Sequence, residues 1–110
     1  MPLEDICEVV ITAADEQWLV DFTARLVADR LAACGQHSQV RSVYTWQGSL
    51  EDEHETRVAL HTRFSLVDAI VARTLADHPY EVPCVIALPI SRANPAYAEW
   101  VRDATSSPAP

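Results

Sequence analysis

The feature that most constrains the fold is the order in which the hydrophobic pattern of the chain changes its period. Four short segments either alternate or are continuously apolar with β-branched residues, which favours strands at 6–12, 40–46, 55–62 and 84–90. Two longer segments, 15–34 and 65–77, repeat their apolar residues at helical spacing. The expected order is therefore strand, helix, strand, strand, helix, strand.

Local signals mark the boundaries of these elements and add a last helix. We expect Asp15 to cap the first helix and Gly35 to end it. We expect Ser65 to cap the second helix and His78-Pro79 to stop it. The last helix should run from Asn94-Pro95 to Trp100. A β-α-β-β-α-β order followed by a helix is typical of a ferredoxin-like sandwich of the α+β class. The chain of 110 residues suits one such domain, which we place at 1–104, and we expect 105–110 to be a disordered tail.

Two of the predicted strands are apolar on both faces. The strand at 84–90 has Val85 and Ala87 on one side and Ile86 and Leu88 on the other. A sheet face open to water would be polar at every second position. Because two helices cover only one face, we expect another subunit to cover the second. We also expect this last strand to be central and buried, with Leu88 in the core and prolines only at its ends.

Composition and charge exclude several classes of partner. Sixteen acidic residues against eight basic ones give a net charge of −8, which disfavours nucleic acid. No apolar run approaches the roughly 20 residues that span a membrane, and the acidic start does not resemble a signal peptide, so we expect a cytoplasmic protein. The three cysteines form no CxxC pair, which favours buried thiols over a zinc or redox motif.

Several motifs together resemble the CutA family of divalent-cation-tolerance proteins. They are "RLAACG" after the first helix, "SVYTWQG", "LEDEHETRVALHT", "HPYEVPCVIALPI" and, near the end, "YAEW". The resemblance runs from the first strand to Trp100. It implies a tight homotrimer that acts in tolerance of copper and other divalent ions by binding them, without catalysis and with no obligatory cofactor.

The copper ligands that the resemblance implies are mostly absent from this sequence. Ile11 stands where the family has a cysteine, and Asp77 stands where it has the first of two histidines, so only His78 remains. Cys84 and His61 replace a usual glutamate and a usual lysine. These substitutions leave the expected fold unchanged and predict weak metal binding without a closed tetrahedral site.

The candidate site residues follow from these motifs and from the acidic run 51–55. For a metal ion we expect His78 and Glu53 to contribute. His78 is also a candidate for a structural role at the end of the second helix, and the acidic run could be a solvated hairpin loop around Gly48. Trp46, Glu55, His61 and Tyr80 are expected to line a cleft between subunits, where Glu55 and Arg57 could form an ion pair across the interface.

Two other functions are considered beside metal tolerance. One is a trimer that senses small ligands in its inter-subunit clefts, like the PII-like signalling proteins. The other is a tautomerase-like enzyme with Pro2 as its base, although Leu3, Glu4 and Asp5 separate Pro2 from the first strand. The sequence contains no nucleophile, metalloprotease or phosphate-loop motif, so we do not expect an enzyme.

Overall fold

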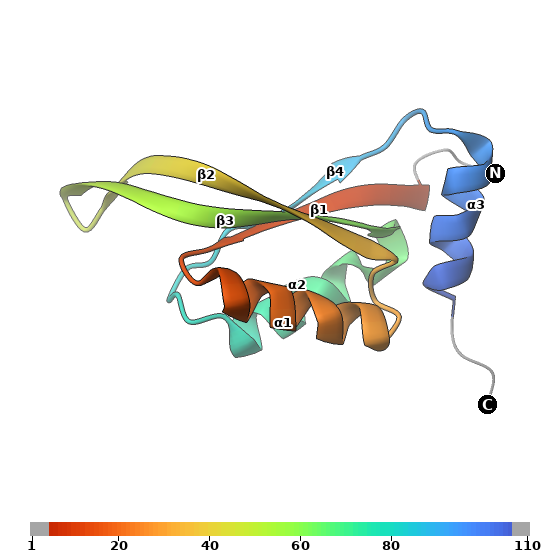
Figure 1. The fold of residues 1–110 in the computed structure, drawn as a ribbon, viewed down its shortest axis with the longest axis horizontal. Coiled ribbons are helices and arrows are strands. Elements are labelled where there is room, and N and C mark those ends of the chain that lie inside the picture. Colours follow the sequence, from red (N-terminus) through yellow and green to blue (C-terminus); the bar gives the residue numbers. More distant parts are fainter. Residues whose placement is uncertain (1–4, 107–110) are drawn as a thin grey trace.

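A four-stranded antiparallel sheet with two helices on one face organises the chain (Figure 1). A computed structural model describes residues 5–106. The sheet order is β2-β3-β1-β4, which is the predicted ferredoxin-like arrangement of the α+β class. The elements are β1 (Ile6–Ala13), α1 (Glu16–Ala28), β2 (Cys34–Trp46), β3 (Ser49–Arg63), α2 (Val67–Asp77), β4 (Val85–Pro89) and α3 (Pro95–Ala104).

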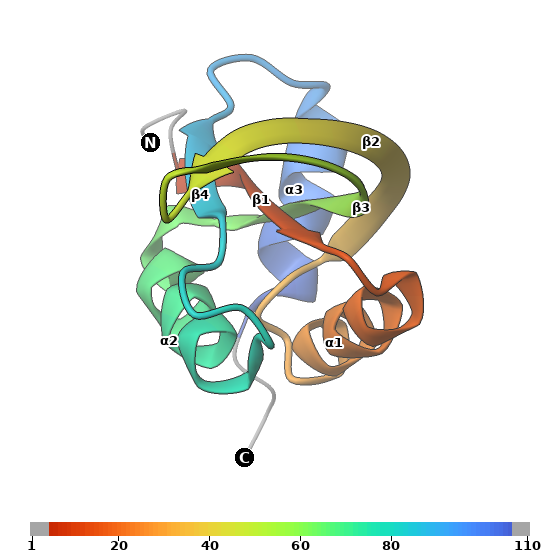
Figure 2. The same cartoon turned by 90° about the vertical axis from the view of Figure 1, so that its left-hand side faces the viewer.

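The main core lies between the sheet and the helix pair α1 and α2, which lie next to each other below the strands in Figure 2. Alternate residues of β1 and β3 point into it, and the apolar stripe of α1 closes it from below. Its fully buried members include Val9, Ile11, Phe22, Leu60 and Ile70. The core is therefore built from the apolar residues that recur with period two in the strands and with period 3.6 in the helices.

The first helix begins as predicted and ends earlier than predicted. The side chain of Asp15 accepts a hydrogen bond from the backbone N–H of Trp18 and caps the helix. The helix ends at Ala28 and not at Gly35. Arg30 takes the left-handed conformation, with φ of 62°, and the N–H groups of Arg30 and the next residue close a Schellman-type turn.

Gly35 lies instead at the start of β2, where α1 approaches the sheet closely. A Cβ atom on Gly35 would come within 2.5 Å of the Thr23 methyl group. This glycine therefore allows helix α1 to pack on β2, and it does not terminate a helix.

The hairpin of β2 and β3 is longer and its turn is tighter than predicted. Gln47 and Gly48 have φ of 50° and 83°, as in a two-residue type I′ turn. This turn lets the strands pair from Trp46 and Ser49 onward. The acidic run 51–55 consequently belongs to β3, and the expectation of a solvated loop was wrong.

The second helix starts after a 3₁₀ turn and stops where predicted. Ser65 lies inside that turn, which spans Phe64–Leu66, and makes no capping hydrogen bond to the helix, so the predicted Ser65 cap was wrong. His78 ends the helix in an extended conformation, because the following Pro79 excludes helical backbone there.

Helix α3 covers one end of the second sheet face. Ile6 of β1 and Ala33 pack there against Ala98 and Val101. The expectation that only another subunit could cover this face is therefore corrected for its end. The helix also runs to Ala104, beyond the predicted end at Trp100.

The first two residues of the predicted disordered tail, Thr105 and Ser106, are held by hydrogen bonds. Thr105 is 2% exposed, and Arg63 donates hydrogen bonds to its hydroxyl and carbonyl oxygens. Arg30 donates to the carbonyl oxygen of Ser106 at 2.6 Å. Residues 107–110 lie outside the described part of the chain.

Strand β4 is an edge strand of this sheet and is not central. It pairs with β1 alone, and its outward residues Ile86 and Leu88 are 54% and 45% exposed. Leu88 is therefore not a core residue of the chain. Pro83 precedes the strand and Pro89 ends it, as expected for residues that cannot donate to a sheet.

Two leucine substitutions, one at a buried and one at an exposed position, test where the core of the chain lies. We expect Leu60→Ala to lower the free energy of unfolding by about 2–5 kcal/mol, because Leu60 is fully buried. Leu75→Ala at a 62% exposed position of α2 is the matched control and should change it by less than about 0.5 kcal/mol. Urea unfolding at one protein concentration measures both, and equal losses would contradict this placement of the core.

Candidate functional site

A cleft of about 690 Å³ lies between the inner side of the β2–β3 hairpin and the loop that joins α2 to β4. The hairpin supplies aromatic and acidic side chains, and the loop closes the opposite wall. The lining residues are Thr12, Ala14, Tyr44, Trp46, Gln47, Glu51, Glu53, Glu55, Tyr80, Glu81, Val82 and Cys84. Four of them are glutamates, so the cleft is strongly acidic.

Two tyrosine–glutamate pairs organise the polar wall of the cleft. The Tyr80 hydroxyl donates to Glu55 Oε2 at 2.7 Å, and the Tyr44 hydroxyl donates to Glu53 Oε1. Glu53 and Glu55 share a face because they are two residues apart on β3. Glu55 is only 5% exposed, whereas Glu53 is open to solvent.

His78 stands behind the cleft wall and supports it. Its Nε2 donates to the carbonyl oxygen of Thr12 at 2.8 Å, and its Nδ1 accepts from the backbone N–H of Tyr80 at 3.0 Å. The ring also contacts Trp18 edge-on. Both ring nitrogens are engaged, so this geometry supports the structural role of His78 by fixing the loop that carries Tyr80.

The structure brings four of the six predicted site residues together, places His78 behind the cleft wall and separates His61 from the cleft. Trp46, Glu53, Glu55 and Tyr80 all line the cleft. His61 is on the same strand face as Glu55, but six residues of extended chain place it roughly 20 Å away. His61 therefore does not line the cavity of the single chain, and its place in a cleft between subunits stays a prediction.

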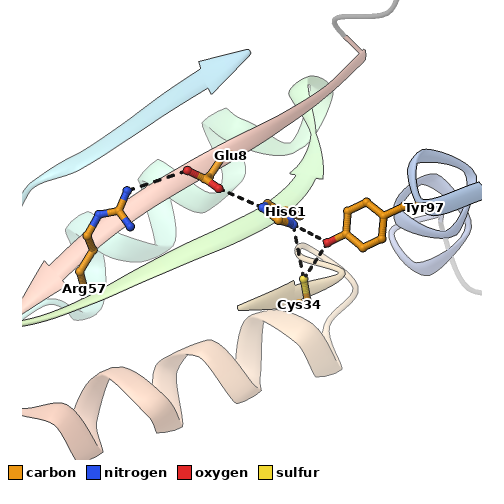
Figure 3. Close-up of polar contacts among 5 residues, drawn as sticks. All are labelled: Glu8, Cys34, Arg57, His61 and Tyr97. Carbon is orange, nitrogen blue, oxygen red and sulfur yellow. Dashed lines mark hydrogen bonds and ion pairs between the residues drawn. The ribbon is translucent and has the colours of Figure 1, made fainter. Parts of the chain in front are cut away.

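His61 belongs to a separate cluster near the other end of β3 (Figure 3). Its Nε2 contacts Glu8 Oε1 at 3.0 Å, and its Nδ1 faces the Tyr97 hydroxyl and the Cys34 sulfur. Arg57 pairs with Glu8 at 3.9 Å within the chain. Arg57 therefore has an intrachain partner, and its pairing with Glu55 across an interface stays a prediction.

Two positions at which the family resemblance implies metal ligands have other roles in this structure. Ile11 is fully buried in the core, and Asp77 pairs with Arg25 at 3.9 Å on the surface. Within residues 5–106, no group of three or more His, Cys, Asp or Glu side chains is arranged to hold a metal ion. Glu53 is exposed in the cleft, where it could contribute to an open, weak site.

Sequence reasoning missed several residues of the cleft and of the cluster around His61. Tyr44, Glu51 and Glu81 line the cleft, and Tyr44 could have been found because it alternates in phase with Trp46. Glu8 and Tyr97 come from elements far apart in the sequence. Only the sheet register and the position of α3 bring them to His61.

The three tyrosines of the chain should resist ionisation together. The hydrogen bond to Glu53, burial and the neighbouring glutamates raise the pKa of Tyr44 to about 12. Burial, followed by the hydrogen bond to Glu55, raises the pKa of Tyr80. Burial and the contact with Cys34 raise the pKa of Tyr97.

Because these pKa values are higher in the folded chain than in the unfolded one, their contribution to stability is complete below pH about 10 and is lost as the pH rises through the folded values. We expect tyrosinate absorbance at pH about 11 to be small in the folded protein and large in denaturant. Tyr44→Phe should remove the tyrosine that ionises first. A folded protein that titrates near pH 10 would contradict these hydrogen-bonded sites.

Comparisons with known proteins agree with this fold. The model of the CutA1 divalent ion tolerance protein family matches residues 7–104. Protein CutA of Mus musculus is 38% identical over 98 residues, which are 88% of this chain and 55% of that protein. The chain therefore spans about half the length of the mammalian relatives it matches.

A bacterial relative and a solved structure match along most of their own lengths. The divalent-cation tolerance protein CutA of Salmonella newport is 34% identical over 94 residues, which cover 84% of this chain and 82% of that protein. The periplasmic divalent cation tolerance protein CutA of Archaeoglobus fulgidus superposes with a TM-score of 0.89 at 26% identity. That match covers 92% of this chain and 99% of the other. The chain belongs to the CutA1 family of divalent ion tolerance proteins.

Proposed function

We propose that this protein acts in tolerance of divalent metal ions, copper among them, by binding the ions as a homotrimer and without catalysis. The observation that carries the proposal is the acidic cleft. Glu51, Glu53, Glu55 and Glu81 face one cavity in a chain of net charge −8. Their combined field concentrates cations there.

The cleft supports weak binding better than tight binding. Two of its carboxylates already accept hydrogen bonds from Tyr44 and Tyr80, and a bound ion would compete with these donors. For one set of ligands, affinity rises along the first-row divalent ions to Cu²⁺ and falls at Zn²⁺. We therefore expect copper to bind most strongly, with Glu53 and Glu55 as direct contributors and His78 acting through the Tyr80 loop.

Calorimetric titration of the purified protein with Cu²⁺, Zn²⁺ and Mg²⁺ tests this site. We expect Glu53→Gln to weaken Cu²⁺ binding about tenfold, or about 1.4 kcal/mol, because it removes one carboxylate ligand. Asp52→Asn is the matched control. It removes the same charge one residue away, from a side chain that pairs with Arg41 at 2.8 Å on the opposite face.

Equal losses in these two variants would mean that the ions respond only to the net charge of the surface, and the cleft would not be the site. Loss of all binding in His78→Ala, with the fold retained, would mean that the imidazole is a direct ligand after all. Retained Cu²⁺ binding in His78→Ala would support its indirect role.

The open sheet face and the hairpin support the trimeric state. Ile86, Leu88 and Trp46 leave large parts of their side chains exposed, and β4 has an unpaired edge within the described residues. A trimer that buries about 2,000 Å² or more at each contact would cover them.

Light scattering at micromolar concentration checks the assembly. We expect three times the mass of the single chain, unchanged on tenfold dilution. A monomer at that concentration would overturn the trimer and leave these apolar groups in water. Ile86→Asp should dissociate the assembly, while Leu75→Asp on the outer side of α2, 62% exposed, is the control that should leave it intact.

The aromatic lining of the cleft favours a second candidate, the binding of a small organic cation. Tyr44, Trp46 and Tyr80 line the same cavity as the glutamates, and aromatic faces with nearby carboxylates attract such cations. Tetramethylammonium is a suitable probe for calorimetry. Heat that saturates with tetramethylammonium and is lost in Trp46→Ala would favour ligand sensing over metal tolerance.

The cellular location and the tautomerase hypothesis stay predictions. No helix among residues 5–106 is long and apolar enough to cross a membrane. A cytoplasmic location stays a prediction, and the Archaeoglobus relative is named periplasmic. Pro2 lies outside the described residues, and the family is named for tolerance of divalent ions.

A further inference from the structure

A second group of polar side chains lies at the far end of β3, away from the acidic cleft (Figure 3). Glu8 comes from β1, Cys34 from the start of β2, His61 from β3 and Tyr97 from α3. The sulfur of Cys34 is 3.7 Å from Nδ1 of His61 and 3.4 Å from the Tyr97 hydroxyl. Neither Cys34 nor Tyr97 is fully buried, so a small ion could reach them.

The outer partners of His61 determine which of its nitrogens carries the proton. Glu8 Oε1 lies 3.0 Å from Nε2, and Arg57 lies 3.9 Å from the other oxygen of the same carboxylate. A charged carboxylate accepts, so Nε2 is the N–H and Nδ1 presents its lone pair toward Cys34. Histidines that bind metals are held in this way by a carboxylate on the other ring nitrogen.

The spacing of the two inner atoms matches a pair of metal ligands. Bonds of about 2.3 Å to sulfur and about 2.1 Å to nitrogen would span 3.7 Å at an angle of roughly 115°. That angle lies between tetrahedral and trigonal geometry. We propose that Cys34 and His61 bind one thiophilic metal ion, Cu⁺, in a site separate from the acidic cleft.

The choice of Cu⁺ follows from the number and type of ligands. Thiolate and imidazole are soft and borderline ligands, which suit Cu⁺ and Zn²⁺ and do not suit Mg²⁺. Zn²⁺ usually takes four ligands, but no third His, Cys, Asp or Glu side chain within residues 5–106 joins this pair. Cu⁺ is stable with three ligands, and an angle near 115° suits a trigonal site, so the pair would leave one position for an exogenous ligand such as chloride.

Tyr97 would assist binding as a donor and not as a ligand. Its hydroxyl lies 3.4 Å from the Cys34 sulfur and faces Nδ1 of His61. Without metal, its O–H donates to Nδ1 of His61, since that nitrogen is the acceptor. When the ion takes Nδ1, the O–H can turn to the sulfur. The Cys34 thiol loses its proton to solvent, so one proton is released per ion.

Competition against the coloured bicinchoninate complex of Cu⁺, under reducing and oxygen-free conditions, tests the site. We expect the protein to remove one Cu⁺ per chain from the complex. Cys34→Ser and His61→Gln should each lower the affinity at least a hundredfold. Cys84→Ser is the matched control, because it removes an exposed cysteine that lines the acidic cleft instead.

Two further variants separate metal binding from a purely structural cluster. Glu8→Gln should weaken Cu⁺ binding about tenfold to a hundredfold, because it removes the carboxylate that holds the ring. Tyr97→Phe should retain one Cu⁺ per chain, since the phenol is not a ligand. Circular dichroism and thermal unfolding of each variant show whether the fold is kept.

The proposal is overturned if the parent removes no Cu⁺, if folded Cys34→Ser binds it as well as the parent does, or if Cys84→Ser abolishes binding. Failure of this proposal can be distinguished from failure of the proposed metal binding in the acidic cleft. Glu53→Gln should leave Cu⁺ uptake unchanged, and Cys34→Ser should leave the calorimetric binding of Cu²⁺ to the cleft unchanged.

Discussion

The register of β3 against its two neighbours is the constraint on which the rest of the structure depends. β3 pairs with β2 from Ser49 to His61, but β1 pairs only with Thr56–Arg63. Residues 49–55 therefore form, with the end of β2, a two-stranded arm that extends beyond the sheet (Figure 1). An isolated two-stranded ribbon is marginally stable in water. The arm thus creates one wall of the cleft and is also the part of the chain that most needs a neighbouring subunit.

The same strand separates two kinds of chemistry along one face. Its first half carries Glu53 and Glu55, whose hard oxygen ligands face a wide cavity. Its second half carries His61, which contacts the thiol of Cys34 and the carboxylate of Glu8 near α3. Both groups lie on one face because the side-chain period of a strand is two. Oxygen ligands and a thiolate–imidazole pair prefer different ions, so the two proposed sites would differ in the ions that they bind.

His78 is the one histidine of the family's copper-ligand motif that this sequence retains. In this structure its ring nitrogens bond to the protein backbone. Its ring bridges β1 and the loop after α2 by bonding Thr12 and Tyr80. These bonds use both nitrogens, and the ring is 8% exposed. The hydroxyl of Tyr80 can then reach Glu55. The conformation of the cleft therefore depends on an imidazole that does not itself face the cavity.

The sequence by itself determined the order of the elements, the helix-covered face and much of the cleft. The alternation of Tyr44 with Trp46 and of Glu53 with Glu55 places each pair on one strand face, and His78-Pro79 must end a helix, because these are local consequences of backbone geometry. The length of the hairpin arm, the edge position of β4 and the end of α1 at Ala28 were decided by tertiary structure. The contact of His61 with Glu8, Cys34 and Tyr97 was decided there too, since it requires a strand register and a helix position that no local pattern specifies.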